Sequence, residues 1–272
     1  MNAIFSTAAC RLCLGTMATL LLLAAPALSP NAHAEDVDLS LPDAINIAGK
    51  QRMLSQRMVS FYAMLGLNVN VDDSKNKLQA AVSLFDTQVS QLQHIAGVDH
   101  ALSFSYKESI STEWAKVRQL AGLTPTKKRA AQLRQLADVL LVKSNDFVLQ
   151  LEDVSGSSQG KLVNLAGRQR MLSQRIAGMY MENVWEVSVE NITAKKERAQ
   201  HEFDEALQQL QETAENTTEI TKLLGLVAGQ WHAFTAINKL KNKAYAQPAM
   251  VAQAADSILE LMNTVTGLYA KL

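Results

Sequence analysis

The sequence predicts an all-α protein built from two tandem antiparallel four-helix bundles that are related by internal duplication. Its 272 residues include only 12 Gly and 5 Pro, and aromatic residues make up 6%. Scarce helix breakers and abundant Leu, Ala, Gln and Val favour helices over sheets. The second observation is a repeat with an offset of 118 residues, which indicates duplication of a whole domain rather than a short solenoid unit.

The first 34 residues have the features of a secretory signal peptide. Arg11 is their only charged residue, an apolar run occupies 20–28, and Ala-His-Ala at 32–34 gives a small-x-small cleavage pattern before Glu35. We therefore expect export to the periplasm with removal of residues 1–34. An uncleaved N-terminal segment that anchors the protein is the alternative.

Removal of this segment leaves 25 basic and 26 acidic residues and takes away both cysteines, Cys10 and Cys13. A disulfide framework is then excluded. A formal charge of −1 provides no field for general nucleic-acid binding. The remaining histidines have no metal-ligand spacing and no nucleophile lies near a base in sequence, so we expect no enzyme, no metal and no cofactor.

Each copy is expected to contain four helices, because helix starts and breakers recur along the chain. In the first bundle, 35–154, helices are predicted at about 43–67, 72–92, 103–120 and 126–151. In the second bundle, 155–272, they are predicted at about 159–188, 192–217, 218–243 and 247–271. A Ser-Gly-Ser-Ser segment at 155–158 either divides the copies or bends a continuous helix.

A twelve-residue motif marks the first helix of each copy. Residues 46–57 read NIAGKQRMLSQR and residues 164–175 read NLAGRQRMLSQR, so ten of twelve positions are identical. On a helix the apolar residues of this segment form two stripes, one of them rich in small residues such as Ala48 and Ser55. We therefore expect the helix to pack against a second bundle as well as its own.

Arg52 lies inside the second stripe, and Arg170 occupies the same position in the second copy. A buried guanidinium needs a carboxylate, backbone carbonyls or a bound anion. Around a pseudo-twofold axis the two arginines would approach each other and hold a planar oxyanion through bidentate hydrogen bonds. Alternatively the arginines pair with carboxylates and only fix the packing, which periodicity alone favours. The carboxylates considered are Asp146, Glu152 and Glu260.

The motif resembles the signature helix of periplasmic sensor domains in nitrate/nitrite sensor kinases of the NarX type. It is more similar still to the N-terminal domain of type IV pili methyl-accepting chemotaxis transducers, the PilJ type. The resemblance covers about 40–154 and 158–272 and implies a four-helix bundle that dimerises through its first helix. Nitrate sensors usually have Ser-Leu-Arg-Met-Gln-Ser where this chain has Lys-Gln-Arg-Met-Leu-Ser at 50–55.

In the nitrate sensors the arginine of this motif grips nitrate at the dimer axis, helped by backbone near the motif glycine. Carried over by motif position, the resemblance implies a ligand site made by Arg52 and Gly49 with Arg170 and Gly167. The supporting motif residues are Asn46, Ser55, Arg57, Asn164, Ser173 and Arg175.

We expect a periplasmic protein that senses or binds a small oxyanion, with nitrate or nitrite the leading ligands. The alternative is a ligand-free scaffold that docks on a membrane-bound chemoreceptor or sensor kinase through surface residues such as Lys50 and Arg57. Related sensors continue into a membrane helix and a signalling module, whereas this sequence ends at Leu272. We therefore expect a soluble binding protein or one that acts through such a partner, with its bundles paired within one chain or in a homodimer.

Overall fold

The structure of the protein is a computed structural model that describes residues 38–238 and 247–272. The predicted signal peptide, 1–34, lies outside the described residues. The described residues belong to one compact unit and form eight helices and no strand. No helix in this part of the chain is long and apolar enough to cross a membrane.

The helices follow the predicted order of two four-helix bundles. The first bundle contains α1 (Leu41–Gly66), α2 (Val71–Gln91), α3 (His100–Ala121) and α4 (Lys127–Ser155). The second contains α5 (Ser158–Val184), α6 (Ile192–Gln211), α7 (Thr218–Asn238) and α8 (Pro248–Tyr269). The predicted all-α fold is therefore confirmed.

Two helices of the second bundle end earlier than their sequence pattern predicts. The first, α5, stops before Glu186, whose φ of 59° is left-handed and incompatible with a continuing helix. The second, α6, stops at Gln211, and the side chain of Asn216 donates to the Leu210 carbonyl at 2.7 Å. This bond satisfies one of the carbonyls that a helix end leaves without a partner.

The join between the two bundles breaks the helix rather than bending it. Gly156 follows α4 with a φ of 58°, the left-handed conformation that glycine adopts at helix ends. Ser157 then caps α5, because its hydroxyl accepts a hydrogen bond from the backbone N–H of Gly160 at 3.0 Å. The chain can therefore reverse direction within two residues.

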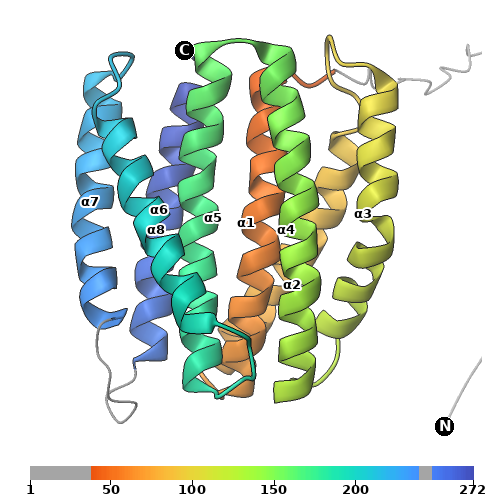
Figure 1. The fold of residues 1–272 in the computed structure, drawn as a ribbon, viewed down its shortest axis with the longest axis vertical. Helices are drawn as coiled ribbons and strands as arrows, with labels where there is room; N and C mark the ends of the chain where they lie inside the picture. Colours follow the sequence, from red (N-terminus) through yellow and green to blue (C-terminus); the bar gives the residue numbers. More distant parts are fainter. Residues whose placement is uncertain (1–37, 239–246) are drawn as a thin grey trace, which may run out of the picture. The chain divides into compact units, whose positions relative to one another are not determined.

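The two motif helices, α1 and α5, lie side by side in the middle of the molecule (Figure 1). Each also contacts helices of its own bundle, α1 against α2 and α4, and α5 against α6 and α8. Ile45 and Ala48, from the stripe of small residues on α1, are buried, as are Leu54 and Met58 from the other stripe. The expectation that the motif helix packs on two sides is confirmed.

An equivalent stacked aromatic pair occurs in both bundles, so the repeat is seen in the packing as well as in the sequence. Trp114 stacks on Phe85 at 4.1 Å between ring centroids, and Trp231 stacks on Phe203 at 3.9 Å. In the first pair the indole N–H donates to Asp86 at 2.8 Å, and the second pair repeats this bond. Both tryptophans are therefore part of the bundle cores, with their polar atom satisfied.

Candidate functional site

Arg52 and Arg170 meet where α1 crosses α5. Their exposed fractions are 1% and 0%. A methyl group placed on Gly49 would lie 3.3 Å from Nη2 of both arginines, and one on Gly167 would lie 3.1 Å from Arg170 Nη2 and 3.4 Å from Arg52 Nη2. The two mid-helix glycines therefore make room for the paired guanidinium groups, which accounts for residues that otherwise weaken a helix.

Neutral oxygen atoms hold the Arg52 guanidinium. Its Nη1 donates to the side-chain oxygen of Asn145 on α4 at 2.9 Å, and its Nη2 donates to the backbone carbonyl of Asn164 on α5 at 3.4 Å. The side chain of Asn164 in turn donates to Glu152. Arg52 is thus held from its own bundle and from the opposite motif helix.

The same arrangement surrounds Arg170. Its Nη1 donates to Asn263 on α8 at 3.1 Å and to the side chain of Asn46 at 2.9 Å, and its Nη2 donates to the Asn46 carbonyl at 3.3 Å. Asn263 follows Asn145 by the same 118 residues that separate the arginines. The site is therefore pseudo-symmetric in its supports as well as in its arginines.

No carboxylate of the described residues forms an ion pair with either arginine. This holds for all three carboxylates considered from the sequence, Asp146, Glu152 and Glu260. The Nε atoms of Arg52 and Arg170 are buried and have no hydrogen-bond partner in the described part of the chain. Two buried cations therefore face each other with neutral acceptors alone, an arrangement that burial makes costly.

This environment lowers the pKa of both guanidinium groups. Burial lowers the pKa of Arg52 to about 9, with a smaller contribution from the charge of Arg168 that Glu152 opposes. Burial likewise lowers the pKa of Arg170 to about 9, and the charge of Arg52 adds to the effect. An anion bound between the two groups would oppose both shifts.

The motif serines support the helix rather than the guanidinium groups. Ser55 Oγ donates to the carbonyl of Arg52 at 2.8 Å, and Ser173 Oγ donates to the carbonyl of Arg170 at 3.0 Å. Such bonds to a carbonyl one turn back are common for serine inside helices. Both hydroxyls are therefore used within their own helix.

The convergent donors of the site suit binding of a planar anion. Guanidinium groups present N–H donors in a fixed fork that matches the oxygens of planar oxyanions. Among residues 38–238 and 247–272 there is no group of His, Cys, Asp and Glu that would hold a metal ion.

A family model described as "Type IV pili methyl-accepting chemotaxis transducer N-term" matches residues 39–139 and again residues 155–258. The chain belongs to this family. No match was found among curated proteins or among solved structures. Each matched region contains one copy of the motif helix, α1 or α5, and membership associates the chain with chemotaxis sensing.

Arg57 and Arg175 are the last arginines of the PilJ-type motif. They also lie at the bundle contact, but they have partners of their own there. Arg57 donates to Asp256 on α8 at 2.6 Å and to Gln174 on α5 at 3.2 Å. Its side chain is only 15% exposed, so it does not present the open surface expected for partner docking. Arg175 lies 3.2 Å from Asp138 on α4.

The sequence analysis did not predict Asn145, Asn263 or one buried ion pair. Asn145 and Asn263 share the repeat offset of 118 residues, so a comparison of the two copies would have found them. Arg134 and Glu182 form a salt bridge with Nη2 2.8 Å from the carboxylate, and their side chains are 3% and 0% exposed. A glutamate within the apolar stretch of α5 was the available signal for this pair.

Proposed function

We propose that this protein is a periplasmic sensor or binding protein that holds a small oxyanion, such as nitrate or nitrite, between Arg52 and Arg170. The observation that carries the proposal is the meeting of two fully buried guanidinium groups with no carboxylate partner among the described residues. A bound anion would neutralise their repulsion and accept hydrogen bonds from both forks. Family membership supports the sensory role.

The close contact of α1 and α5 favours a small ligand. Each guanidinium already lies within 3.5 Å of where a Cβ would stand on either motif glycine. A compact planar anion fits such a helix crossing better than a bulky one. We propose that its binding is read out by a membrane-bound chemoreceptor or sensor kinase.

The test is the thermal unfolding of the mature chain, residues 35–272, with millimolar nitrate, nitrite, sulfate or chloride. We expect nitrate or nitrite to raise Tm selectively, since a ligand at a hundred times its Kd stabilises the native state by about 2.7 kcal/mol. Arg52→Ala and Arg170→Ala should each remove this rise.

A matched pair of glycine variants separates loss of the site from loss of stability. Gly49→Ala adds a methyl 3.3 Å from both guanidinium groups and should weaken the nitrate response, whereas Gly229→Ala on α7 meets nothing within 4 Å and should keep it. If all four anions leave Tm unchanged while the arginine variants only lower it, the arginines are structural and the proposal is wrong.

A further inference from the structure

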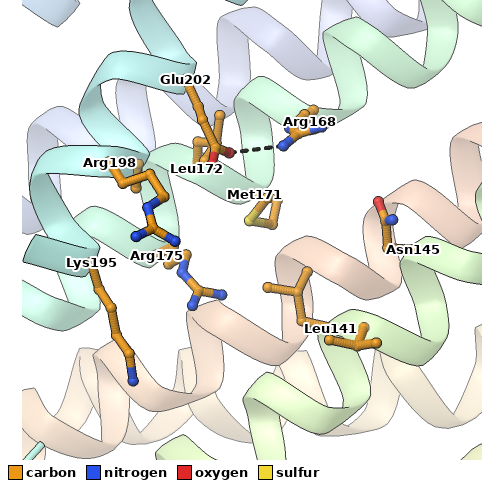
Figure 2. Close-up of a pocket in the computed structure, with 11 residues that line it drawn as sticks. Leu141, Asn145, Arg168, Met171, Leu172, Arg175, Lys195, Arg198 and Glu202 are labelled. Carbon is orange, nitrogen blue, oxygen red and sulfur yellow. Dashed lines mark hydrogen bonds and ion pairs between the residues drawn. The ribbon is translucent and has the colours of Figure 1, made fainter. Parts of the chain in front are cut away.

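A second cationic site lies in a pocket of about 350 Å³ between α4, α5 and α6. Figure 2 shows basic side chains from α5 and α6 around this hollow, with apolar residues of α4 and α5 beside them. The basic residues are Arg168, Arg175, Lys195 and Arg198. The apolar walls are Leu141, Val142, Met171, Leu172 and Ala199.

The nearby carboxylates pair with Arg168 and Arg175 but leave Lys195 and Arg198 without an ion pair among the described residues. Glu202 pairs with Arg168 at 2.8 Å. Asp138 Oδ1 lies 3.2 Å from Arg175 Nη1, yet this oxygen accepts no hydrogen bond in the described structure. Lys195 and Arg198 form no ion pair with any described residue. Arg175 is the strongest sign of a ligand site, because its side chain is only 19% exposed and it donates no hydrogen bond to a described residue.

The duplicated bundle provides an internal comparison, since Arg57 and Lys77 occupy the equivalent positions on α1 and α2. Arg57 donates hydrogen bonds to Gln174 and Asp256. Lys77 lies 2.9 Å from Asp73 and 3.1 Å from Asp256. The equivalent basic groups of the first copy are therefore satisfied by the protein itself.

Sequence differences between the copies account for this contrast. Asp73, a partner of Lys77, is replaced by Asn191 in the second copy, and Glu260 is replaced by Val142; in the opposite direction, Leu84 is replaced by Glu202. At the position of Ala80 the second pocket has Arg198, so one guanidinium is gained. Because Glu202 pairs with Arg168, the second pocket keeps one additional guanidinium, Arg198, and Val142 gives it an apolar wall where the first copy has a carboxylate.

Arg134 explains why Arg175 lacks the amide acceptor that its counterpart has. Arg57 donates to Gln174 Oε1, and the equivalent oxygen for Arg175 would be Gln56 Oε1. That oxygen already accepts from Arg134 Nη1 at 2.5 Å. The guanidinium of Arg175 consequently remains directed to the pocket, where it lines the wall.

We infer that this pocket binds a small organic carboxylate with a short apolar body, at a site that touches the arginine pair only through Asn145, which lines the pocket and accepts a hydrogen bond from Arg52. The carboxylate would accept hydrogen bonds from Arg175 and from Arg198 or Lys195, and the apolar body would cover Met171 and Leu141. A bare inorganic anion would leave these apolar walls facing water.

The experiment is isothermal titration of mature 35–272 with benzoate, succinate and inorganic phosphate. We expect at least one carboxylate to bind, and Arg175→Ala or Arg198→Ala to weaken its Kd by about tenfold or more, as loss of a charge-assisted bond does. Arg198→Ala introduces the residue that the first copy has at Ala80, so it should fold normally.

Two controls make the result specific. Lys77→Ala removes the first copy's counterpart of Lys195 and should leave the Kd of the carboxylate unchanged. Arg170→Ala, whose hydrogen-bond partners Asn46 and Asn263 do not line the pocket, should also leave it unchanged, so failure of the nitrate site and failure of this pocket are distinguishable. The inference is overturned if neither carboxylate binds, if phosphate alone binds, or if Lys77→Ala weakens binding as much as Arg198→Ala.

Discussion

The two buried arginines are supported by amide and carbonyl oxygens, although acidic residues lie close by in the sequence. Asp146 follows Asn145 directly, but one residue turns about 100° around a helix, so only one of the two side chains can face Arg52. The motif predicted that Arg52 is buried at a helix contact, and this is confirmed. The choice of Asn145 over Asp146 depends on the rotation of α4, which packing sets and local sequence does not.

The neutral support can be converted into a charged one by a single atom change. Asn145→Asp would place a carboxylate where the amide oxygen now lies, 2.9 Å from Arg52 Nη1. We expect a higher Tm without anions, since the buried cation gains a counter-charge, and a smaller nitrate response. Thermal unfolding with and without nitrate measures both effects. Asn183→Asp, at an exposed position on α5, is the control and should change neither.

The lowered pKa values predict how anion binding depends on pH. The pKa of each arginine is lowered by burial to about 9 in the folded protein, well below its ordinary value in the unfolded chain. Below pH 9 both groups carry the charge that anion binding requires. As pH rises through 9 the folded protein releases protons that the unfolded chain, with its higher arginine pKa, still retains. In that window the arginines' contribution to stability rises while their affinity for an anion falls.

The nitrate-induced rise in Tm should therefore be smaller at pH 9.5 than at pH 7.5. Differential scanning calorimetry at the two values measures it, with the Arg52→Ala and Arg170→Ala variants as baselines. An equal rise at both pH values would contradict this prediction.

At the level of helices, periodicity and breakers predicted the order of the elements well, while several helix ends were missed. The predicted extension of α5 beyond Val184 follows from continued apolar residues, but Trp185 leaves the helix. Its indole ring lies against Gly66 at the end of α1. The equivalent of Trp185 in the first copy is Leu67, so the repeat gave no sign of this contact between bundles.

Gly66 is therefore expected to be intolerant of a side chain. A methyl group there would lie 2.1 Å from the Trp185 ring. We expect Gly66→Ala to lower the free energy of unfolding by about 1–3 kcal/mol, the cost of overpacking. Urea denaturation measures the change. Gly225→Ala on α7 meets nothing within 4 Å and should instead be neutral or stabilising by up to about 1 kcal/mol.

Across the whole molecule the pseudo-symmetry is broken by the buried ion pair of Arg134 and Glu182. The equivalent positions in the opposite copies are Ala252 and Met64. If the first bundle paired with another first bundle, Arg134 would face Met64, and if the second paired with its own kind, Glu182 would face Ala252. The first mismatch leaves the buried Arg134 with only Asp138 at 3.6 Å, and the second leaves Glu182 without its guanidinium, so the pair favours contact between unlike bundles.

The opposite copies also supply the substitutions that test this role. Arg134→Ala should lower the free energy of unfolding by about 3–5 kcal/mol, because it leaves the buried Glu182 unpaired. Glu182→Met should cost less, because Arg134 keeps Asp138 at 3.6 Å. The double variant should recover most of that loss, since it reproduces the neutral pair of Ala252 and Met64. A double variant as unstable as the sum of the singles would argue against coupling across the bundle contact. Size-exclusion chromatography of the double variant would show whether like bundles now associate.

Because the short link through Gly156 and Ser157 joins the two motif helices, assembly of the arginine site is a first-order process rather than a second-order one. With both motif helices on one chain, their encounter is intramolecular, and the effective concentration of one half for the other is fixed by the link and not by the amount of protein. Dilution then cannot separate Arg52 from Arg170, and ligand titrations should be independent of protein concentration. In a homodimer every substitution appears twice, whereas here each half can change alone. Arg134, Glu182 and Arg198 are such single changes, each present in one copy and absent from the other.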